Sequence, residues 1–300
     1  MKVYLILVNY NGAKLTEECI DSIHKSKYDD QYEVHTVVVD NGSKVDETKV
    51  LKQKYEDVIF IRSEENLGFA GGNNLGIKRA LAEGADYVLL INNDTALDKG
   101  MLQELMKNAE PDIVLTGKIL YYSKPNTIWC EGGTIDWKKG NSYNGKIGEK
   151  DTHNTEKYYC EFASGCCMMI PREIINKIGM LQDDYFMYCE DTEYCLRLKQ
   201  AGYQIMVVPK AVLYHKVSAS SGGEDSPFST YYITRNRLRL VKEHNELFDF
   251  SALMFSLISR YIRMFQFAFY SSKNSKAIYY AIRDFKVGKN GKVSYPKLGI

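Results

Sequence analysis

The first hundred residues alternate short apolar runs with segments of helical spacing, and this alternation limits the fold more than any other feature. The runs lie at residues 2–10, 33–43, 58–66 and 87–94. Continuous apolar strands separated by helices are typical of a parallel sheet that is covered on both faces. We therefore expect an α/β fold with a mostly parallel central sheet and helices on both faces.

Each of the four runs ends in polar residues. The ends are Asn9 to Gly12, Asp40 to Ser43, Asn66 to Asn73 and Asn92 to Asp94. A single end of this kind is explained by a turn, because Asn and Asp hydrogen-bond their own backbone and commonly stop strands. In open parallel sheets, however, ligands bind beyond the carboxyl ends of the strands. Four polar ends at one edge of a sheet therefore predict a binding site.

Composition places the chain among globular proteins. Its 300 residues are 45% hydrophobic, which is enough for one large or two modest cores. The seven cysteines are an odd number without a CxxC pair, and the apolar run after Lys2 is short and broken by Asn9. Neither feature is typical of a secreted, disulfide-bonded protein, so we predict free thiols and a cytoplasmic location.

The second half of the chain is less regular. Residues 113–154 are rich in Gly, Tyr and Lys, and residues 161–179 predict a turn of small residues, a strand and a helix. Glu190 and Asp191 precede a helical run that ends at Gln200, and a late strand reaches His215. We expect a nucleotide-binding and catalytic domain over residues 1–220 and a helical, basic region over residues 221–300.

These motifs, in this order and spacing, resemble the inverting family-2 glycosyltransferases, which bind nucleotide sugars on a GT-A fold. The resemblance covers residues 2–219, and the run YYITRNRLRLV from Tyr231 is similar to the bacterial rhamnosyltransferase-like branch. It implies sugar transfer from dTDP-rhamnose or a UDP-sugar to a glycan or lipid-linked glycan in cell-surface polysaccharide biosynthesis. It rests on the motifs VNYNG, VVVDNGS, ENLGFAGGNNLGI, LLINNDT, ASGCCMMIPRE, FMYCEDTEYCLRLKQAGY and VLYHKVSASSG.

The resemblance places Asp40 at the nucleoside, where its carboxylate is suited to accept a hydrogen bond from a pyrimidine N–H or a ribose hydroxyl. The alternative is an Asx turn that closes Asp-Asn-Gly-Ser. We expect the glycine-rich stretch after the third run to be a loop before a helix that begins near Asn73. Its backbone N–H groups can then approach phosphate or sugar oxygens, unless it is a plain turn. The residues expected to bind the nucleotide sugar are Asn9, Asn11, Asp40, Asn41, Asn66, Gly71, Gly72, Asn73, Asn92 and Asn93.

A divalent metal is expected at the end of the fourth run. In the resembling family the last Asp of a DxD-type motif binds Mg²⁺ or Mn²⁺, which neutralises the leaving diphosphate. That residue is Asp94 here, while Asn92 stands where the family has the first Asp. The family also places a metal-binding His after a late strand, which corresponds to His215. The alternative for His215 is a purely structural role.

Glu190 and Asp191 are the expected catalytic residues. Transfer with inversion needs one carboxylate base to take the proton of the acceptor hydroxyl. The family carries this base on the Asp of its Glu-Asp motif, which implies Asp191 as the base and Glu190 as a residue that orients the acceptor or the base. The alternative is structural, because acidic residues at the start of a helix are stabilised by its dipole.

Two other functions compete with this interpretation. A sugar nucleotidyltransferase shares the sheet topology and the metal but needs a basic, glycine-rich loop after the first strand, and residues 8–12 contain no Arg or Lys. A non-catalytic scaffold that binds sugar nucleotides or glycans is also compatible with the fold. The intact Glu-Asp motif argues against the scaffold.

The C-terminal fifty residues contain nine Lys or Arg and one acid, Asp284. The apolar run 247–270 is interrupted by Arg260 and Arg263, so it is not expected to span a membrane. We predict that residues 247–300 contact an anionic membrane; packing on the catalytic domain and a homodimer are the alternatives. Nucleic acid is not an expected partner, because no recognised binding module accompanies the basic residues. If the run is helical, one apolar stripe contains Phe250, Leu253, Met254, Leu257, Ile258 and Tyr261.

Overall fold

The structure is a computed structural model that describes residues 1–217 and 226–300. The expected domain boundary at residue 220 and the end of the VLYHKVSASSG motif lie outside the described residues.

The first half of the chain forms the predicted parallel sheet. The four strands pair side by side in parallel in the order β4-β1-β2-β3. Their polar ends therefore lie at the same edge of the sheet, as the sequence predicted. The elements are β1 (Lys2–Asn9), α1 (Ala13–His24), β2 (Glu33–Asn41), α2 (Thr48–Lys54), β3 (Ile59–Ser63), α3 (Gly68–Ala82) and β4 (Tyr87–Ile91).

The second half extends the same sheet with strands of both directions. Strand β11 lies antiparallel between β4 and β6, and β12 pairs in parallel with β6. The irregular stretch 113–154 contains four strands, of which β8 and β9 form a separate hairpin. The elements are β5 (Thr95–Leu97), α4 (Met101–Lys107), β6 (Ile113–Tyr121), β7 (Lys124–Glu131), β8 (Gly133–Asp136), β9 (Asn141–Asn144), β10 (Tyr158–Cys160), β11 (Cys167–Pro171), α5 (Arg172–Ile178), η1 (Asp183–Tyr185), α6 (Glu190–Gln200) and β12 (Gln204–His215).

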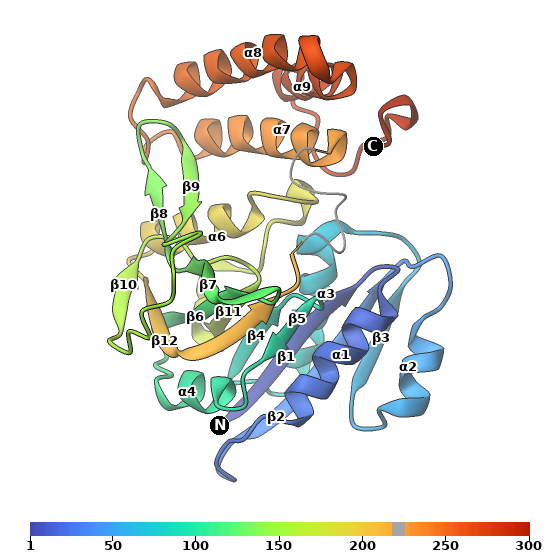
Figure 1. Ribbon diagram of the computed structural model, residues 1–300, viewed down its shortest axis with the longest axis vertical. Coiled ribbons are helices and arrows are strands. Elements are labelled where there is room, and N and C mark those ends of the chain that lie inside the picture. Colours follow the sequence, from blue (N-terminus) through green and yellow to red (C-terminus); the bar gives the residue numbers. More distant parts are fainter. Residues whose placement is uncertain (218–225) are drawn as a thin grey trace.

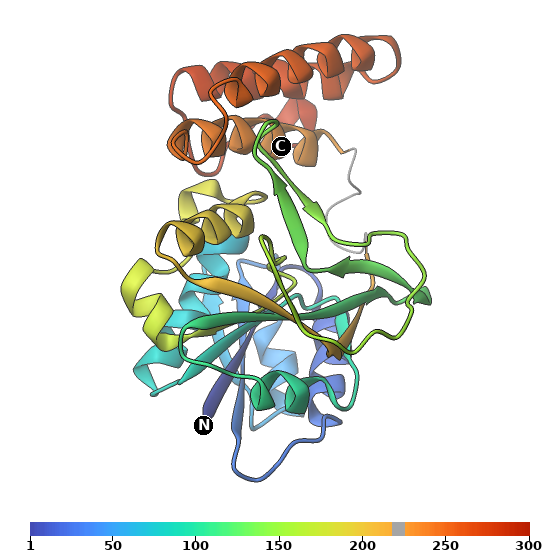
Figure 2. The same ribbon diagram turned by 90° about the vertical axis from the view of Figure 1, so that its left-hand side faces the viewer.

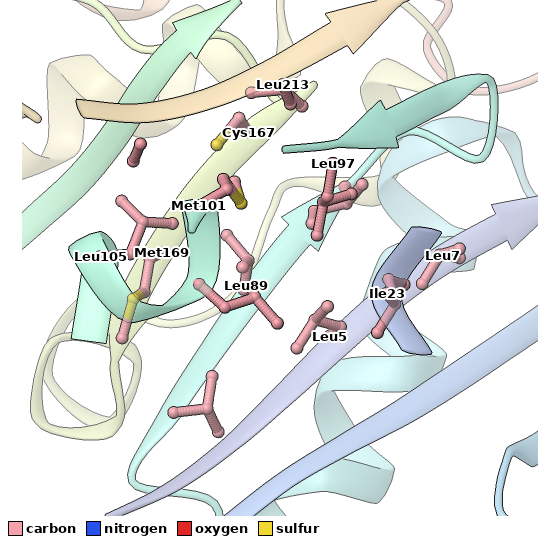
Figure 3. Close-up of a cluster of buried hydrophobic side chains, with 14 of the residues drawn as sticks. Leu5, Leu7, Ile23, Leu89, Leu97, Met101, Leu105, Cys167, Met169 and Leu213 are labelled. Atoms are coloured by element: carbon pink, nitrogen blue, oxygen red, sulfur yellow. The ribbon is translucent and has the colours of Figure 1, made fainter. Parts of the chain in front are cut away.

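Helices cover both faces of the sheet, as expected. Alternate residues of a strand point to opposite faces, so Leu5 and Leu7 of β1 join one core while Tyr4 and Ile6 join the other. Figure 3 shows the first core, where side chains of β1 and β4 pack against Ile23 of α1 and against α4. The second core is closed by α3, α5 and α6.

The glycine-rich segment after β3 differs from the expectation. It is not a loop before a helix, because α3 begins at Gly68 and includes Gly71 to Asn74. A Cβ atom on Gly76 would lie 2.4 Å from Ile6 Cγ2, and one on Gly72 would lie 2.9 Å from Val8 Cγ1. Close packing of α3 on β1 therefore requires glycine, and it outweighs the cost of about 1 kcal/mol per glycine in a helix.

The C-terminal region is helical, as predicted. Figures 1 and 2 show α7, α8 and α9 packed together as a layer beyond one end of the sheet. Ser226 caps α7 by accepting a hydrogen bond from the Ser229 N–H, at 3.2 Å. In the two described ranges, no helix combines the length and the apolar character that crossing a membrane requires. The elements are α7 (Pro227–Glu243), α8 (Ala252–Tyr270), α9 (Ser272–Lys286) and η2 (Pro296–Leu298).

Candidate active site

The ends of β1 and β4 are joined by a hydrogen-bond chain through α1. Asn93 Nδ2 donates to Thr16 Oγ1 at 2.9 Å, and Thr16 Oγ1 donates to Asn9 Oδ1 at 2.8 Å. Asn9 is fully buried, and its Nδ2 donates to Glu47 Oε2 at 2.7 Å. Two of the predicted binding residues, Asn9 and Asn93, are thus brought together and hold the edge of the sheet in shape.

Asp40 lies inside a turn and beside an arginine that the sequence reasoning missed. The Ser43 N–H donates to Asp40 Oδ1 at 3.1 Å, so the side chain closes the Asp-Asn-Gly-Ser turn, as the alternative expected. Arg62 Nη1 lies 2.5 Å from Asp40 Oδ2, because the parallel register of β2 and β3 pairs the two residues. Asp40 Oδ2 also accepts from the Glu47 N–H at 3.3 Å, and Asp40 is fully buried, so its role at a nucleoside stays a prediction.

Three predicted amides shape the loops at this edge. Asn41 Nδ2 donates to the Gly68 carbonyl at 2.9 Å, while Asn41 Oδ1 accepts from the Leu67 N–H at 3.0 Å. Asn66 Oδ1 accepts from the Gly68 N–H at 2.8 Å, which starts α3. Asn11 has a positive φ of 51° and accepts from the Lys44 N–H at 2.9 Å. These residues set the backbone that a nucleotide sugar would meet.

Asn73 and Gly71 lie elsewhere on α3. Asn73 is buried within the helix, where its Nδ2 donates to the Phe69 carbonyl at 2.9 Å. Gly71 borders a cavity of about 290 Å³ near the start of α3. The residues that line this cavity include Asn66, Gly71, Lys78, Asp183, Phe186 and Lys292, but neither of the expected catalytic residues nor the expected metal ligands.

Asp94 and His215 meet where β5 pairs with β12. His215 Nε2 lies 3.1 Å from Asp94 Oδ1, and both side chains are buried. The angle between them is not that of a hydrogen bond, because Asp94 Oδ1 has no hydrogen-bond partner, and neither has His215 Nδ1. Trp129, which the sequence reasoning also missed, packs edge-on against the His215 ring with centroids 4.5 Å apart.

This pair fits a divalent cation. The atoms that face each other are Asp94 Oδ1, a buried carboxylate oxygen without a hydrogen-bond partner, and His215 Nε2, 3.1 Å away. Buried polar atoms normally have such partners, and both kinds of atom bind Mn²⁺. Within residues 1–217 and 226–300, no three His, Cys, Asp or Glu side chains gather around one point. Asp94 and His215 would therefore hold a metal together with oxygens of the donor, as Mg²⁺ sites commonly do.

Glu190 and Asp191 open helix α6 in different surroundings. Asp191 is partly exposed and accepts hydrogen bonds from the N–H groups of Thr192 at 2.7 Å and Gly165 at 3.2 Å. Glu190 is 6% exposed, and its Oε2 has no hydrogen-bond partner. Burial and the neighbouring Asp191 carboxylate raise the pKa of Glu190. Burial also raises the pKa of Asp191, although the two N–H groups oppose this. A proton on the pair therefore prefers Glu190, which leaves Asp191 as the ionised member.

A turn of small residues joins Glu190 and Asp191, called here the acid pair, to the polar end of β4. Gly165 N donates to Asp191, and the carbonyl of the next residue, Cys166, accepts from the Asn92 N–H at 3.3 Å. A Cβ atom on Gly165 would lie 2.8 Å from the Phe69 ring and 3.7 Å from Asp191 Cβ. The turn was predicted, but the need for glycine at 165 comes from the packing of Phe69.

Comparison with known proteins adds a family and two curated relatives. The family described as Glycosyl transferase family 2 matches residues 4–179. A low-salt glycan biosynthesis hexosyltransferase, Agl10 of Haloferax volcanii, is 28% identical over 78% of this chain and 73% of its own. A dTDP-rhamnosyl transferase, RfbF of Shigella flexneri, is 25% identical over 85% of this chain and 86% of its own.

Solved structures show a shared fold at low identity. GalNAc-T7, solved with UDP, GalNAc and Mn²⁺, is 16% identical with a TM-score of 0.63 over 81% of this chain, which spans 48% of that protein. Residues 1–349 of Staphylococcus aureus TarS are 17% identical with a TM-score of 0.57, over 95% of this chain and 80% of theirs. A mannosyltransferase from Pyrobaculum calidifontis, solved with GDP-Man and Mn²⁺, has a TM-score of 0.56 at 14% identity, over 98% of this chain and 76% of its own.

Proposed function

Because the chain belongs to glycosyl transferase family 2 and has the GT-A fold, we propose that it is an inverting glycosyltransferase of cell-surface polysaccharide biosynthesis. Its donor is a nucleoside-diphosphate sugar, and its acceptor is a hydroxyl of a glycan or a lipid-linked glycan. One observation carries this proposal. The consecutive residues Gly165 and Cys166 bond to Asp191 and to the backbone of Asn92, so a carboxylate base lies next to the edge that carries Asp94.

The proposed reaction is a single displacement. Asp191 takes the proton of the acceptor hydroxyl while that oxygen attacks the anomeric carbon of the donor. The bond from this carbon to the diphosphate oxygen breaks on the opposite face, and the nucleoside diphosphate leaves with both electrons. Mg²⁺ or Mn²⁺ at Asp94 and His215 would neutralise the charge on the diphosphate. Glu190, held neutral beside Asp191, keeps a second negative charge away from the base.

For the donor we propose dTDP-rhamnose or a UDP-sugar, supported by the name of the Shigella relative and by the rhamnosyltransferase-like run from Tyr231. A matching donor with Mn²⁺ should raise the melting temperature of the full chain. A ligand that binds only the folded state at a hundredfold excess over Kd stabilises it by about 2.7 kcal/mol. A thermal-shift series of dTDP-, UDP- and GDP-sugars measures this, with each nucleotide alone as the control. The absence of a shift with every nucleotide sugar would contradict the proposal.

Product analysis separates this function from its competitors. A scaffold would bind the donor and leave it intact, whereas a nucleotidyltransferase would consume a nucleoside triphosphate and release pyrophosphate. Asp191, which as a residue is partly exposed, favours the transferase, because a scaffold has no use for a base beside its ligand.

We also propose that helix α8 rests on an anionic membrane at the cytoplasmic face, which would suit a lipid-linked acceptor. The predicted stripe is divided in the structure, because Leu253 and Leu257 pack on the protein while Phe250 is 102% exposed. Phe269, at the other end of the helix, is 90% exposed. The large apolar side chains exposed between them are Met254, Phe255, Ile258, Tyr261, Ile262 and Phe265.

The two arginines of α8 do not divide this exposed face. Arg260 Nε is buried, and burial together with the charges of Arg237 and Arg263 lowers the pKa of Arg260 to about 10. Arg263 packs over the Phe267 ring at 4.4 Å, and Phe267 is buried. Exposed lysines on or next to α9, such as Lys273 and Lys276, supply positive charge beside the apolar face. Each Lys or Arg near an anionic surface contributes about 1 kcal/mol to binding.

The full chain is expected to pellet with vesicles that contain anionic lipid, and less so at high salt. Replacing Ile258 and Phe265 together by Glu should abolish pelleting, because both side chains are exposed and would meet the headgroups. Val50→Glu, at an exposed apolar residue of α2, is the matched control and should leave pelleting unchanged. Equal pelleting of all three proteins would contradict the membrane contact. A change from dimer to monomer in the double variant, without vesicle binding by the wild type, would support the homodimer instead.

A further inference from the structure

Residues 185–189, the segment before the acid pair, have an unusual backbone. Phe186, Tyr188 and Cys189 have φ angles of 66°, 68° and 70°, and none of them is glycine. A positive φ is strained for a residue with a side chain, both in the left-handed region, where Cys189 lies, and in a γ-turn, where Phe186 lies with ψ of −60°. Three such residues among the four that precede Glu190 persist only if the surrounding protein holds them there.

Asn236 of α7 makes hydrogen bonds that hold this segment in place. It is fully buried, and its Nδ2 lies 2.9 Å from the Tyr185 carbonyl, 2.8 Å from that of Met187 and 2.9 Å from that of Tyr188. An amide NH₂ group has two hydrogens, so three carbonyls of the segment converge on two donors. Without Asn236, these three carbonyls would lose the donor that they share, and with it a common constraint on the segment.

Arg235 ties the same segment to the C-terminal tail. Its side chain is 1% exposed, with Nη2 at 3.2 Å from the Tyr185 carbonyl and Nη1 at 2.7 Å from the Gly291 carbonyl. Its Nε donates to Asn236 Oδ1 at 2.9 Å, which fixes the orientation of the amide. The Gly291 N–H in turn donates to the Asp184 carbonyl at 2.6 Å. Both ends of the segment are therefore anchored to the C-terminal region.

The segment also touches the expected donor side of the site. The Phe69 N–H donates to the Phe186 carbonyl at 2.7 Å, and a Cβ atom on Gly68 would lie 2.0 Å from that carbonyl oxygen. The Cys189 carbonyl then accepts from the Glu193 N–H at 2.8 Å in the first turn of α6. Residues 185–189 thus connect the start of α3 to the first turn of α6, which contains the acid pair.

We propose that Asn236 and Arg235 are positioning residues, which hold residues 185–189 in this conformation and thereby aim Asp191 at the acceptor hydroxyl. The proposal rests on the function proposed above. It assigns a role to the Arg-Asn pair within YYITRNRLRLV, and it makes helix α7 a part of the catalytic apparatus. A displacement of about 1 Å at reacting groups can lower a rate about 10²-fold, so these residues act on turnover without touching either substrate.

The same helix offers a matched control. Arg237 is also a buried arginine that donates to backbone carbonyls, with Nε at 2.9 Å from Gly140 O and Nη2 at 2.7 Å from Lys139 O. It holds the turn between β8 and β9, not the segment before Glu190. Arg235→Gln and Arg237→Gln therefore remove the same chemical group from two different targets.

The test compares Asn236→Leu, Arg235→Gln and Arg237→Gln in the full chain. Leucine keeps the size of the amide but has no donors. We expect Asn236→Leu and Arg235→Gln to lower kcat about 10²-fold with little change in donor Kd. Peptides that cover residues 184–191 should also exchange amide hydrogen faster in these two variants. Arg237→Gln should lower the melting temperature but leave kcat and this exchange close to wild type.

Equal kcat in Arg235→Gln and Arg237→Gln, or unchanged exchange of residues 184–191, would overturn the proposal. If Asn236→Leu fails to fold, the two arginine variants decide the question alone. Hydrogen exchange is measured without substrate, so it still shows whether α7 holds the segment if the wild type transfers no sugar. A wild type that transfers no sugar would contradict the proposed function. Faster exchange in only Asn236→Leu and Arg235→Gln would still show that α7 anchors the segment.

Discussion

Replacement of Asp191 by asparagine is expected to lower kcat about 10²-fold or more while donor Kd stays nearly unchanged. The amide has the shape of the carboxylate, but its single oxygen can keep only one of the two bonds, because the Gly165 N–H donates to Oδ2 and the Thr192 N–H to Oδ1. It cannot accept the proton of the acceptor hydroxyl, so the loss falls on turnover. Steady-state kinetics and calorimetric titration of the donor measure the two quantities separately.

Glu190→Gln is the matched variant for this experiment. Glutamine imitates a protonated Glu190, so its kcat should remain well above that of Asp191→Asn. Because a base must be ionised, kcat should fall as pH decreases through the pKa of Asp191, which burial raises above its ordinary value. Because Glu190 is already neutral when Asp191 titrates, glutamine at 190 should leave the pH of this fall nearly unchanged. Near-normal kcat in Asp191→Asn would refute the assignment of the base.

Asp94→Ala should weaken donor binding and its dependence on divalent metal together. Loss of a residue that merely supports a metal ligand costs roughly 10- to 100-fold in metal affinity or activity, and loss of a ligand should cost at least as much. The buried Oδ1 of Asp94 has no other partner that the substitution would disrupt. Donor titrations with and without Mn²⁺ in wild type and variant measure the coupling.

Asp98→Ala is the control for Asp94→Ala. Asp98 is an exposed carboxylate four residues further on, and its Oδ1 accepts from the Gly100 N–H at 3.0 Å. Its loss should leave both donor affinity and metal dependence unchanged. Equal transfer by the wild type in excess chelator would show that Asp94 and His215 do not act through a metal. Their proximity would then be structural.

Much of the fold follows from local patterns. The four apolar runs and the helical segments between them predicted that β1 to β4 are parallel and that their polar ends lie at one edge of the sheet, because buried parallel strands are apolar throughout. Asp94 and His215 were proposed as partners from a family resemblance, and the structure brings them within 3.1 Å. The start of α3 was placed too late, since propensity alone disfavours a helix at Gly68 to Gly72.

In the first hundred residues, the sequence by itself determined which segments are strands and helices, apart from the start of α3, and which residues lie at strand ends, because side-chain periodicity and turn chemistry are local properties. Only the tertiary structure decided that Arg62 lies against Asp40, that Asn236 holds the segment before Glu190, and that the Nε of Arg260 in α8 is buried. Each of these features depends on which strand residues pair or on which face of a helix packs against the protein, and the distance along the chain does not reveal this. Strand pairing and helix packing supply that information, because they select one partner for each buried polar group.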